Sequence, residues 1–383
     1  MDKPTVQDIF HRFYPAYLDQ YSPSPVQAKV AHNIMNCKTG AYGANVCVCE
    51  DCGFVQIHYN SCRNRCCPMC QAVPKEMWMD ARREDVLDAP YFHLVFTVPD
   101  ILNPVIYSNQ RLLYDALYHA ASSTISELTA DPKHLGAKVG YICILHTWGS
   151  EINFHPHIHA ILLGGGLASN NQWKDNGENF FLPIRVISKM FRGKYLEELK
   201  RLWEEDKLVF HGTAEKFRNH YTFKELLDSC YGMDWIPHCK KTFNGAQTVI
   251  KYLGKYTHRI AVSNHRTVRM DDDTVTFLVK DYRNEGQWKE LTISGVEFVR
   301  RFLMHVPPRR FVRIRHYGLL CSRTKSQKLT LCRNLLGCKK YLSKLRDMEM
   351  PEILEHLYGI KVCVCKACGG HLGKPQMRMP LRC

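Results

Sequence analysis

Three histidines at alternate positions mark the stretch from Phe154 to Gly164, which is otherwise mostly apolar. Side chains two residues apart in a β-strand point to the same face of a sheet. The spacing therefore predicts a strand with His155, His157 and His159 on one face. Imidazoles held side by side on a rigid strand form a metal site, here a catalytic divalent-metal site. The alternatives are a histidine-triad nucleotide hydrolase and histidines that serve only the structure of a sheet.

A second strand precedes the histidine strand. Residues 141–148 are mostly apolar, and a short turn joins them to the histidine strand, so the two are expected to pair antiparallel. In such a hairpin His146 lies roughly opposite His157 on the same face. We therefore favour His146 as the third ligand beside His157 and His159, with a role in orienting those ligands as the alternative. The other candidates for the third ligand are Glu151, His155 and Gln247.

Charge points to an anionic partner. The 383-residue chain carries a formal net charge of +15, which favours nucleic acid ahead of an acidic membrane surface. Between Arg300 and Arg346 there are fourteen Lys or Arg and no Asp or Glu, with aromatic rings interleaved. Cations for phosphates and rings for bases are what a groove for single-stranded DNA uses. The candidate DNA contacts in this segment are Arg309, Arg310, Arg313 and Arg315.

Cysteines are numerous, at eighteen. The chain has neither a run of about 18 apolar residues nor an apolar N-terminal signal segment, so we expect an intracellular protein with no membrane partner. Clustered thiols in a reducing compartment more often bind zinc than form disulfides. Two C-x-x-C pairs predict one closed, structural zinc site with the ligands Cys49, Cys52, Cys67 and Cys70. The remaining cysteines nearby are candidates for a second zinc site, or else buried residues or partial ligands: Cys37, Cys47, Cys62 and Cys66.

A smaller cysteine cluster lies near the C-terminus. Cys365 and Cys368 form a single C-x-x-C pair and are candidates for a further zinc site. The other ligands of such a site would come from Cys332, Cys338, Cys363, His371 and Cys383.

A pair of tyrosines lies in residues 245–260, which have the apolar spacing of a helix. Tyr252 and Tyr256 are four residues apart and share one helical face. Nearby cations favour the anion of a tyrosine, whose ordinary pKa is about 10, and so make it a nucleophile toward a phosphate. The alternative is an aromatic pair in the core. The nearby cations that are also candidate DNA contacts are Lys251, Lys255 and Arg259.

These elements combine into one chemistry. Phosphoryl transfer needs a positioned nucleophile, a metal ion and a cationic cradle. Histidine-hydrophobic-histidine together with Y-x-x-K-Y resembles the HUH endonuclease superfamily. Four motifs narrow the resemblance to the rolling-circle transposases of the insertion sequence 91 family, over about residues 20–370: NSCRNRCCPMCQ (60–71), LHTWG (145–149), YLGKYTHR (252–259) and RIRHYGLL (313–320).

The resemblance implies a fold and a division into domains. Strands mixed with helices, antiparallel where they pair, predict an α+β fold, and the family implies an HUH-type core with a central antiparallel sheet flanked by helices. We expect residues 1–74 to form a helical, zinc-binding DNA-recognition module. Residues 75–298 form the nuclease and strand-transfer domain, with an insertion around 165–235. Residues 299–383 form a basic DNA-binding region.

The resemblance also implies an activity. Family members nick single-stranded DNA, join it through a 5′-phosphotyrosine and leave a free 3′-hydroxyl, which makes this chain a metal-dependent tyrosine DNA endonuclease and transposase. Tyr252 and Tyr256 correspond to the nucleophiles, and His157 and His159 to ligands of Mg²⁺ or Mn²⁺. The structural ion is Zn²⁺. The alternatives are an initiator of plasmid rolling-circle replication and a non-catalytic, zinc-stabilised nucleic-acid-binding protein.

The expected partners are single-stranded DNA at transposon ends and target DNA, in the bacterial cytoplasm at the nucleoid. No phosphate-binding loop of the form G-x-x-x-x-G-K-[ST] is present, so unwinding is expected from a host helicase or replication factor. Two positions depart from the family pattern. Relatives usually have His at the position of Cys66, an exchange that zinc tolerates. They often have His near position 45, where this chain has Asn45, which leaves the ligands of a second zinc open.

Overall fold

A central antiparallel sheet carries the histidine strand. The computed structural model describes residues 3–175, 182–235, 237–243, 248–249, 254, 260–281, 284–374 and 376–378. The strands of the central sheet are β3 (Tyr91–Thr97), β4 (Lys138–Trp148), β5 (Phe154–Leu167), β6 (Trp173–Asp175), β7 (His238–Phe243) and β11 (Ile314–Gly318). Their order is β11-β4-β5-β3-β7, with β6 beside β5, and every pairing is antiparallel.

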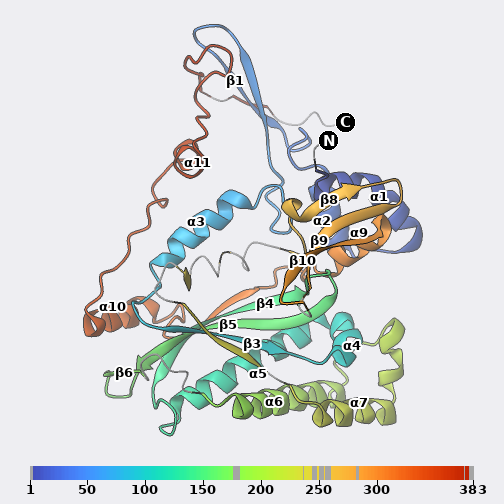
Figure 1. The fold of residues 1–383 in the computed structure, drawn as a ribbon, viewed down its shortest axis with the longest axis vertical. Coiled ribbons are helices and arrows are strands. Elements are labelled where there is room, and N and C mark those ends of the chain that lie inside the picture. Colours follow the sequence, from blue (N-terminus) through green and yellow to red (C-terminus); the bar gives the residue numbers. More distant parts are fainter. Residues whose placement is uncertain are drawn as a thin grey trace.

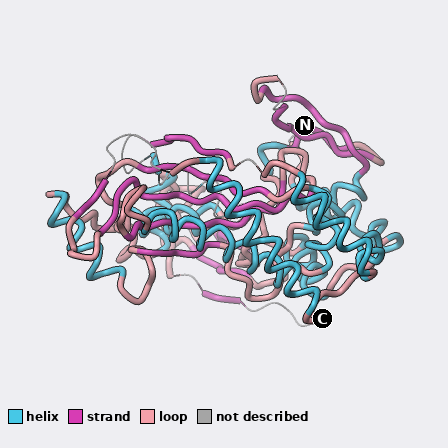
Figure 2. Tube along the Cα trace, turned by 90° about the horizontal axis from the view of Figure 1, so that it is seen from below, coloured by secondary structure: helices cyan, strands magenta, loops and turns pink. Residues whose placement is uncertain are grey.

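Helices cover one face of this sheet: α4 (Asn103–Ser108), α5 (Gln110–Ala130), α6 (Ile184–Glu204) and α7 (His220–Gly232). Alternate residues of β3, Phe92, Leu94 and Phe96, are fully buried in the core beneath them. The segment predicted as an insertion contributes to this core, since Phe191 and Tyr195 of α6 are fully buried there and the Phe96 and Phe191 rings lie 5.0 Å apart. Figure 2 views the molecule from the side of these helices.

The opposite face of the sheet is covered differently. Here α3 (Ala72–Arg83) and α10 (Lys325–Leu336) pack through Met79 and Leu329 against Ile161 and Leu163 of β5. In Figure 1, α3 lies above the sheet, and α5, α6 and α7 lie below it. Val249 is buried in the same cluster. Side chains of β5 alternate, so the odd-numbered residues of this strand, including its central histidines, share this face.

A second core joins the N-terminal helices to residues 260–306. It contains α1 (Val6–Gln20), α2 (Pro25–Met35), β8 (Thr267–Met270), β9 (Thr274–Asp281), β10 (Gln287–Ser294) and α9 (Gly295–Met304). Thr5 and Ser24 begin α1 and α2 with capping boxes, which satisfy backbone donors that a helix start leaves unpaired. Phe10 of α1 packs edge-on against Phe302 of α9, with ring centroids 5.2 Å apart. The N-terminal helices thus pack on residues near position 300.

A third sheet projects from the rest of the molecule (Figure 1). It consists of β1 (Ala44–Val48), β2 (Val55–Tyr59) and β12 (Gln376–Arg378), in the order β12-β1-β2. After α10 the chain passes through α11 (Met350–Tyr358) and returns to this sheet, where Ala44 lies opposite Arg378. Packing therefore crosses the predicted divisions at residues 74 and 298, and that division stays a prediction.

The predicted α+β class is confirmed, with antiparallel sheets and helices throughout. Short 3-10 helices cover Asp100–Leu102, Gly212–Arg218 and Asn264–Arg266. Among the described residues, no helix has both the length and the apolar composition that crossing a membrane requires.

Candidate functional site

The histidine cluster, defined as His146, His157 and His159, lies on the face of the central sheet that carries α3. The predicted register of the hairpin is confirmed, because His146 of β4 pairs directly with His157 of β5. One ring nitrogen from each histidine lies within 4.8 Å of the others. The three side chains are 4%, 8% and 8% exposed, so a ligand there would be shielded from water. Strand alternation brings the set together, as the sequence predicted.

The geometry and protonation of the cluster suit a divalent ion. The Nε2 atoms of His157 and His159 lie 3.0 Å apart, which is about the separation of neighbouring ligands in an octahedral site with bonds of about 2.1 Å. His157 donates from Nδ1 to the backbone carbonyl oxygen of His155 at 2.6 Å, which leaves its Nε2 lone pair for a ligand. Burial lowers the pKa of His157 to about 3 and holds the pKa of His159 well below its usual range. Both rings are therefore neutral and able to coordinate.

A fourth histidine, His93 of β3, lies behind the cluster and was missed in the sequence. Its Nε2 is 2.8 Å from Nδ1 of His159, and the two rings stack with centroids 5.0 Å apart. Metal-binding histidines commonly donate their second N–H to such a partner, which fixes the ring and its tautomer. The signal was present, because β3 alternates and its odd positions share a face with His159. What the sequence did not supply was the pairing of β3 with β5.

Two other candidates for the third ligand, His155 and Glu151, lie outside the cluster. His155 is half-exposed and pairs with Asp100, its Nδ1 3.2 Å from the carboxylate. The carboxylate of Glu151 contacts Asn153 within the turn. Gln247 lies outside the described residues.

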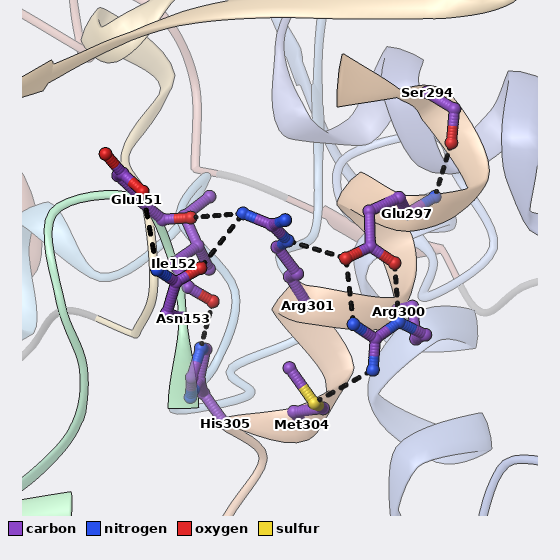
Figure 3. Close-up of polar contacts among 9 residues, drawn as sticks. All are labelled: Glu151, Ile152, Asn153, Ser294, Glu297, Arg300, Arg301, Met304 and His305. Carbon is purple, nitrogen blue, oxygen red and sulfur yellow. Dashed lines mark hydrogen bonds and ion pairs between the residues drawn. The ribbon is translucent and has the colours of Figure 1, made fainter. Parts of the chain in front are cut away.

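A clamp holds the turn of the histidine hairpin in place (Figure 3). Arg301 of α9 donates to the carbonyl oxygen of Glu151 and to Oδ1 of Asn153, each at 3.0 Å. His305, which caps α9, donates from Nε2 to the carbonyl oxygen of Ile152 at 3.0 Å. Ile152 is fully buried with φ of +60°, a costly conformation for a β-branched residue. The second core therefore fixes the end of the hairpin that carries the histidine cluster.

Tyr252 and Tyr256, with Lys251, Lys255 and Arg259, lie outside the described residues. Two described residues flank Tyr252 in the sequence. Val249 is 1% exposed and packs in the apolar cluster on the histidine face of the sheet. A Cβ added to Gly254 would meet the Met79 sulfur of α3, so the backbone there lies directly against that helix.

The structure groups the thiols differently from the prediction. The inner cysteine group comprises Cys37, Cys62, Cys67 and Cys70, whose sulfur atoms lie within 4.8 Å of one another. The predicted set joined Cys49 and Cys52 to Cys67 and Cys70. A hairpin explains why that is wrong: β1 and β2 intervene, and strands of five residues carry Cys49 and Cys52 roughly 17 Å from the base of the hairpin.

Cys49 and Cys52 lie instead beside cysteines that are distant in the sequence. The outer cysteine group comprises Cys49, Cys52, Cys365 and Cys368, again with all sulfur atoms within 4.8 Å. Neither group contains Cys47 or Cys66, which were candidate ligands. Cys47 points into the small core of the projecting sheet, and Cys66 is buried in the second core, where burial raises its pKa to about 11.

Two family models match the chain. "Transposase zinc-binding domain" matches residues 9–98, and "Putative transposase" matches residues 140–328. "Putative transposase y4qJ" of Sinorhizobium fredii is 40% identical over 369 residues, which are 95% of this chain and 93% of that protein. The chain belongs to the insertion sequence 91 family of transposases. "Transposase for insertion sequence element IS801" of Pseudomonas savastanoi pv. phaseolicola is 30% identical over 309 residues, 79% of this chain and 72% of that protein.

Among solved structures, the transposase is similar to the conjugative relaxase TrwC in complex with oriT DNA. The sequence identity is 14% and the TM-score is 0.26, with 67% of this chain and 96% of that chain covered. A metal-free structure of that relaxase with oriT DNA gives 13% identity and a TM-score of 0.25, over 43% of this chain and 71% of that chain.

The four arginines predicted to contact DNA divide into two pairs in this transposase. Arg309 and Arg310 are exposed. Arg313 is 9% exposed, with its guanidinium 5.9 Å from the centre of the Trp148 ring. It was predicted to be a surface cation, and the structure shows that it is buried. Arg315 stacks on Tyr118 at 3.9 Å and forms an ion pair with a carboxylate of α5. A count of charges in the sequence does not distinguish exposed arginines from arginines that pack against aromatic rings.

A cavity of about 310 Å³ lies between the inner cysteine group and the segment that follows the tyrosines. Cys66, Cys67 and Gly254 contribute to its wall. Its polar lining comprises Arg65, Gln71, Lys75, Ser263 and His265. The transposase thus places a recess with the cationic side chains of Arg65 and Lys75 beside the inner cysteine group and beside Gly254.

Proposed function

We propose that this transposase nicks and rejoins single-stranded DNA through a 5′-phosphotyrosine intermediate, in rolling-circle-type transposition. The observation that carries the proposal is the histidine cluster itself. Three buried imidazoles converge on one face of the central sheet. Val249 packs on that same face and stands three residues before Tyr252 in the sequence.

The residues have distinct roles in this proposal. The phenol oxygen of Tyr252 or Tyr256 forms a bond to the phosphorus, and the bond from that phosphorus to the 3′ oxygen breaks. The tyrosine proton is lost, the departing 3′ oxygen gains a proton, and no oxidant or reductant is needed. Two tyrosines allow one to hold a 5′ end while the other cleaves.

The histidine cluster would hold Mg²⁺ or Mn²⁺. When bound, the ion supplies positive charge to the non-bridging oxygens of the phosphate. Nitrogen donors favour a transition-metal ion over Mg²⁺, so Mn²⁺ is the better probe. His146, His157 and His159 would contribute ring-nitrogen lone pairs from a rigid sheet, and the clamp on the turn holds the hairpin that carries them.

DNA recognition is assigned to two surfaces, one of which the inner cysteine group supports. Arg309 and Arg310 are exposed cations for phosphates. The cavity lined by Arg65 and Lys75 would receive the strand beside Gly254. The inner cysteine group would bind structural Zn²⁺ and hold the wall of that cavity, since Cys67 belongs to both. Unwinding of duplex DNA is assigned to a host helicase or to replication.

The test is formation of a covalent adduct. A single-stranded oligonucleotide from the end of the element is incubated with the protein and Mn²⁺, and the product is resolved on a denaturing gel. We expect an adduct in the wild type, with mass spectrometry placing the nucleotide on the peptide that contains Tyr252 and Tyr256. The Tyr252→Phe/Tyr256→Phe double variant should lose the adduct by at least about 10³-fold while it still binds the oligonucleotide.

The matched control is Tyr221→Phe, which removes an exposed tyrosine of α7 on the opposite side of the sheet and should leave the adduct unchanged. A double variant that forms the adduct normally would show that the nucleophile is misassigned. No adduct in the wild type would favour a zinc-stabilised DNA-binding protein without catalysis.

A further inference from the structure

The outer cysteine group joins two parts of the chain that are more than 300 residues apart. The Cys49 and Cys368 sulfur atoms are 3.5 Å apart and separated by 319 positions, and those of Cys52 and Cys365 are 3.8 Å apart and separated by 313 positions. Disulfide sulfur atoms lie about 2.05 Å apart, so these are not disulfides. Four thiolates around a tetrahedral zinc, with bonds of about 2.3 Å, lie about 3.8 Å from one another. The observed spacing fits a metal-bound set.

The two C-x-x-C turns have the same local structure. Each is followed by a glycine with positive φ, +70° at Gly53 and +78° at Gly369, a conformation that residues with a Cβ rarely adopt. In each turn that glycine donates its amide to the carbonyl of the first cysteine at 3.0 Å. Two such turns facing each other form the two halves of one site.

Backbone amides are aimed at the sulfur atoms of the C-terminal turn. Ala367 donates to Cys365 Sγ and Gly370 to Cys368 Sγ, each at 3.4 Å. Such donors favour the thiolate over the thiol, and the thiolate is the form that binds zinc. They are not needed for thiols that only fill a core.

The strands around the site have little apolar core of their own. Cys47, Cys49, Cys365 and Leu372 make up the only buried cluster between the described residues of this sheet and the C-terminal turn. The backbone contacts continue from β12 through Gly373, which donates to the carbonyl oxygen of Val48 at 2.9 Å. Small sheets without a core are held by metals or disulfides, because buried apolar area alone does not offset the cost of ordering the chain.

We propose that Cys49, Cys52, Cys365 and Cys368 bind one structural Zn²⁺ that fastens the C-terminal segment to the N-terminal hairpin. The four thiols bind as thiolates and release their protons to solvent. This site lies partly outside residues 9–98, the range that the zinc-binding family model matches. The zinc holds together the two ends of the segment between Cys52 and Cys365. That segment includes the basic stretch from Arg300 to Arg346. The proposal does not depend on the nuclease chemistry.

The test measures zinc in the full-length protein. Metal content is determined by mass spectrometry after dialysis, in the wild type and in the variants Cys365→Ser/Cys368→Ser and Cys49→Ser/Cys52→Ser. Each double variant should contain one zinc fewer than the wild type. The matched control is Cys363→Ser, an exposed cysteine outside both groups that should leave the zinc content unchanged.

Limited proteolysis supplies a second measurement. In the Cys365→Ser/Cys368→Ser variant, cleavage between α11 and β12 should become at least about ten times faster, because the segment loses its anchor. Circular dichroism checks that the rest of the fold remains. Unchanged zinc content in this variant, or loss of zinc only in Cys49→Ser/Cys52→Ser, would overturn the proposal, and so would iron in place of zinc.

Discussion

The histidine cluster and the outer cysteine group are both sets of side chains with the spacing to hold a metal ion, but they are assembled in opposite ways. The histidines come from two neighbouring strands of one hairpin, within residues 146–159, and lie on a sheet whose other face is packed with helices. The cysteines come from turns 313 to 319 positions apart, on a small sheet with almost no core. The sheet alone arranges the histidine cluster before any metal binds. In our proposal the bound metal arranges the outer cysteine group.

The inner cysteine group lies between these extremes. Its ligands fall within residues 37–70, and two of them, Cys37 and Cys67, are fully buried against the second core. In our proposals the protein thus has a preformed site, a site integrated into a core and a site that joins distant parts of the chain. Four substitutions test this comparison.

The largest effect is expected for Cys67→Ser. This side chain is fully buried in the second core and belongs to the inner cysteine group. Its loss should lower the free energy of unfolding by about 3 kcal/mol or more, measured by urea denaturation. Cys368→Ser is the comparison, because that cysteine is exposed and its turn is peripheral. An equal loss of unfolding free energy in the two variants would contradict the idea that the inner cysteine group stabilises the fold more than the outer group does.

Removing His93 should weaken metal binding without affecting zinc. His93→Phe deletes the partner of His159 Nδ1, so the affinity for Mn²⁺ should fall by about 10–100-fold, measured by titration of the dialysed protein. His93→Gln, which keeps a hydrogen-bonding group, should recover part of the affinity. His155→Phe is the control, because His155 pairs with Asp100 outside the cluster. Unchanged affinity in His93→Phe would show that the sheet alone fixes His159.

The clamp on the hairpin turn is tested by Arg301→Ala. Three partners lose charged hydrogen bonds, so the free energy of unfolding should fall by about 1–2 kcal/mol and adduct formation should slow. Arg300→Ala is matched to it, since Arg300 pairs with the same Glu297 but makes no contact with the turn in Figure 3. Adduct rates that fall equally in both variants would argue against the clamp.

The smallest effect concerns pH. Hydrogen bonds from Arg300, and then Arg301, lower the pKa of Glu297. A depressed pKa contributes stability above the unfolded value of about 4.3, and this contribution is lost as the pH falls through the folded value. Glu297→Gln should therefore reduce the loss of stability below about pH 4.3 by less than about 1 kcal/mol, measured by denaturation across pH. An identical pH profile in the variant would contradict this pairing.

The comparison also explains what could be read from the sequence. Alternation and a short turn were enough to place His146 opposite His157, because register follows from local geometry. Helices α1 and α2 likewise lie in the N-terminal part of the chain, which was expected to be helical. These features depend on residues close together in the chain.

What failed depends on contacts between distant residues. Spacing joined Cys49 and Cys52 to the nearest C-x-x-C pair, but a β-hairpin separates those turns and brings Cys365 and Cys368 to them instead. The role of His93 required knowing that β3 pairs with β5. The burial of Arg313 likewise follows from tertiary packing, which a charge count does not contain.

The most direct test of the central claim is the yield of covalent adduct in the His157→Ala/His159→Ala variant. The wild type and the variant are incubated with the single-stranded oligonucleotide and Mn²⁺, and zinc content is measured on the same samples. We predict that the adduct disappears while the zinc content stays unchanged, since the cysteine groups are separate from the histidine cluster. Normal adduct formation, or a fall in zinc content, would contradict the assignment of the histidine cluster as the catalytic metal site.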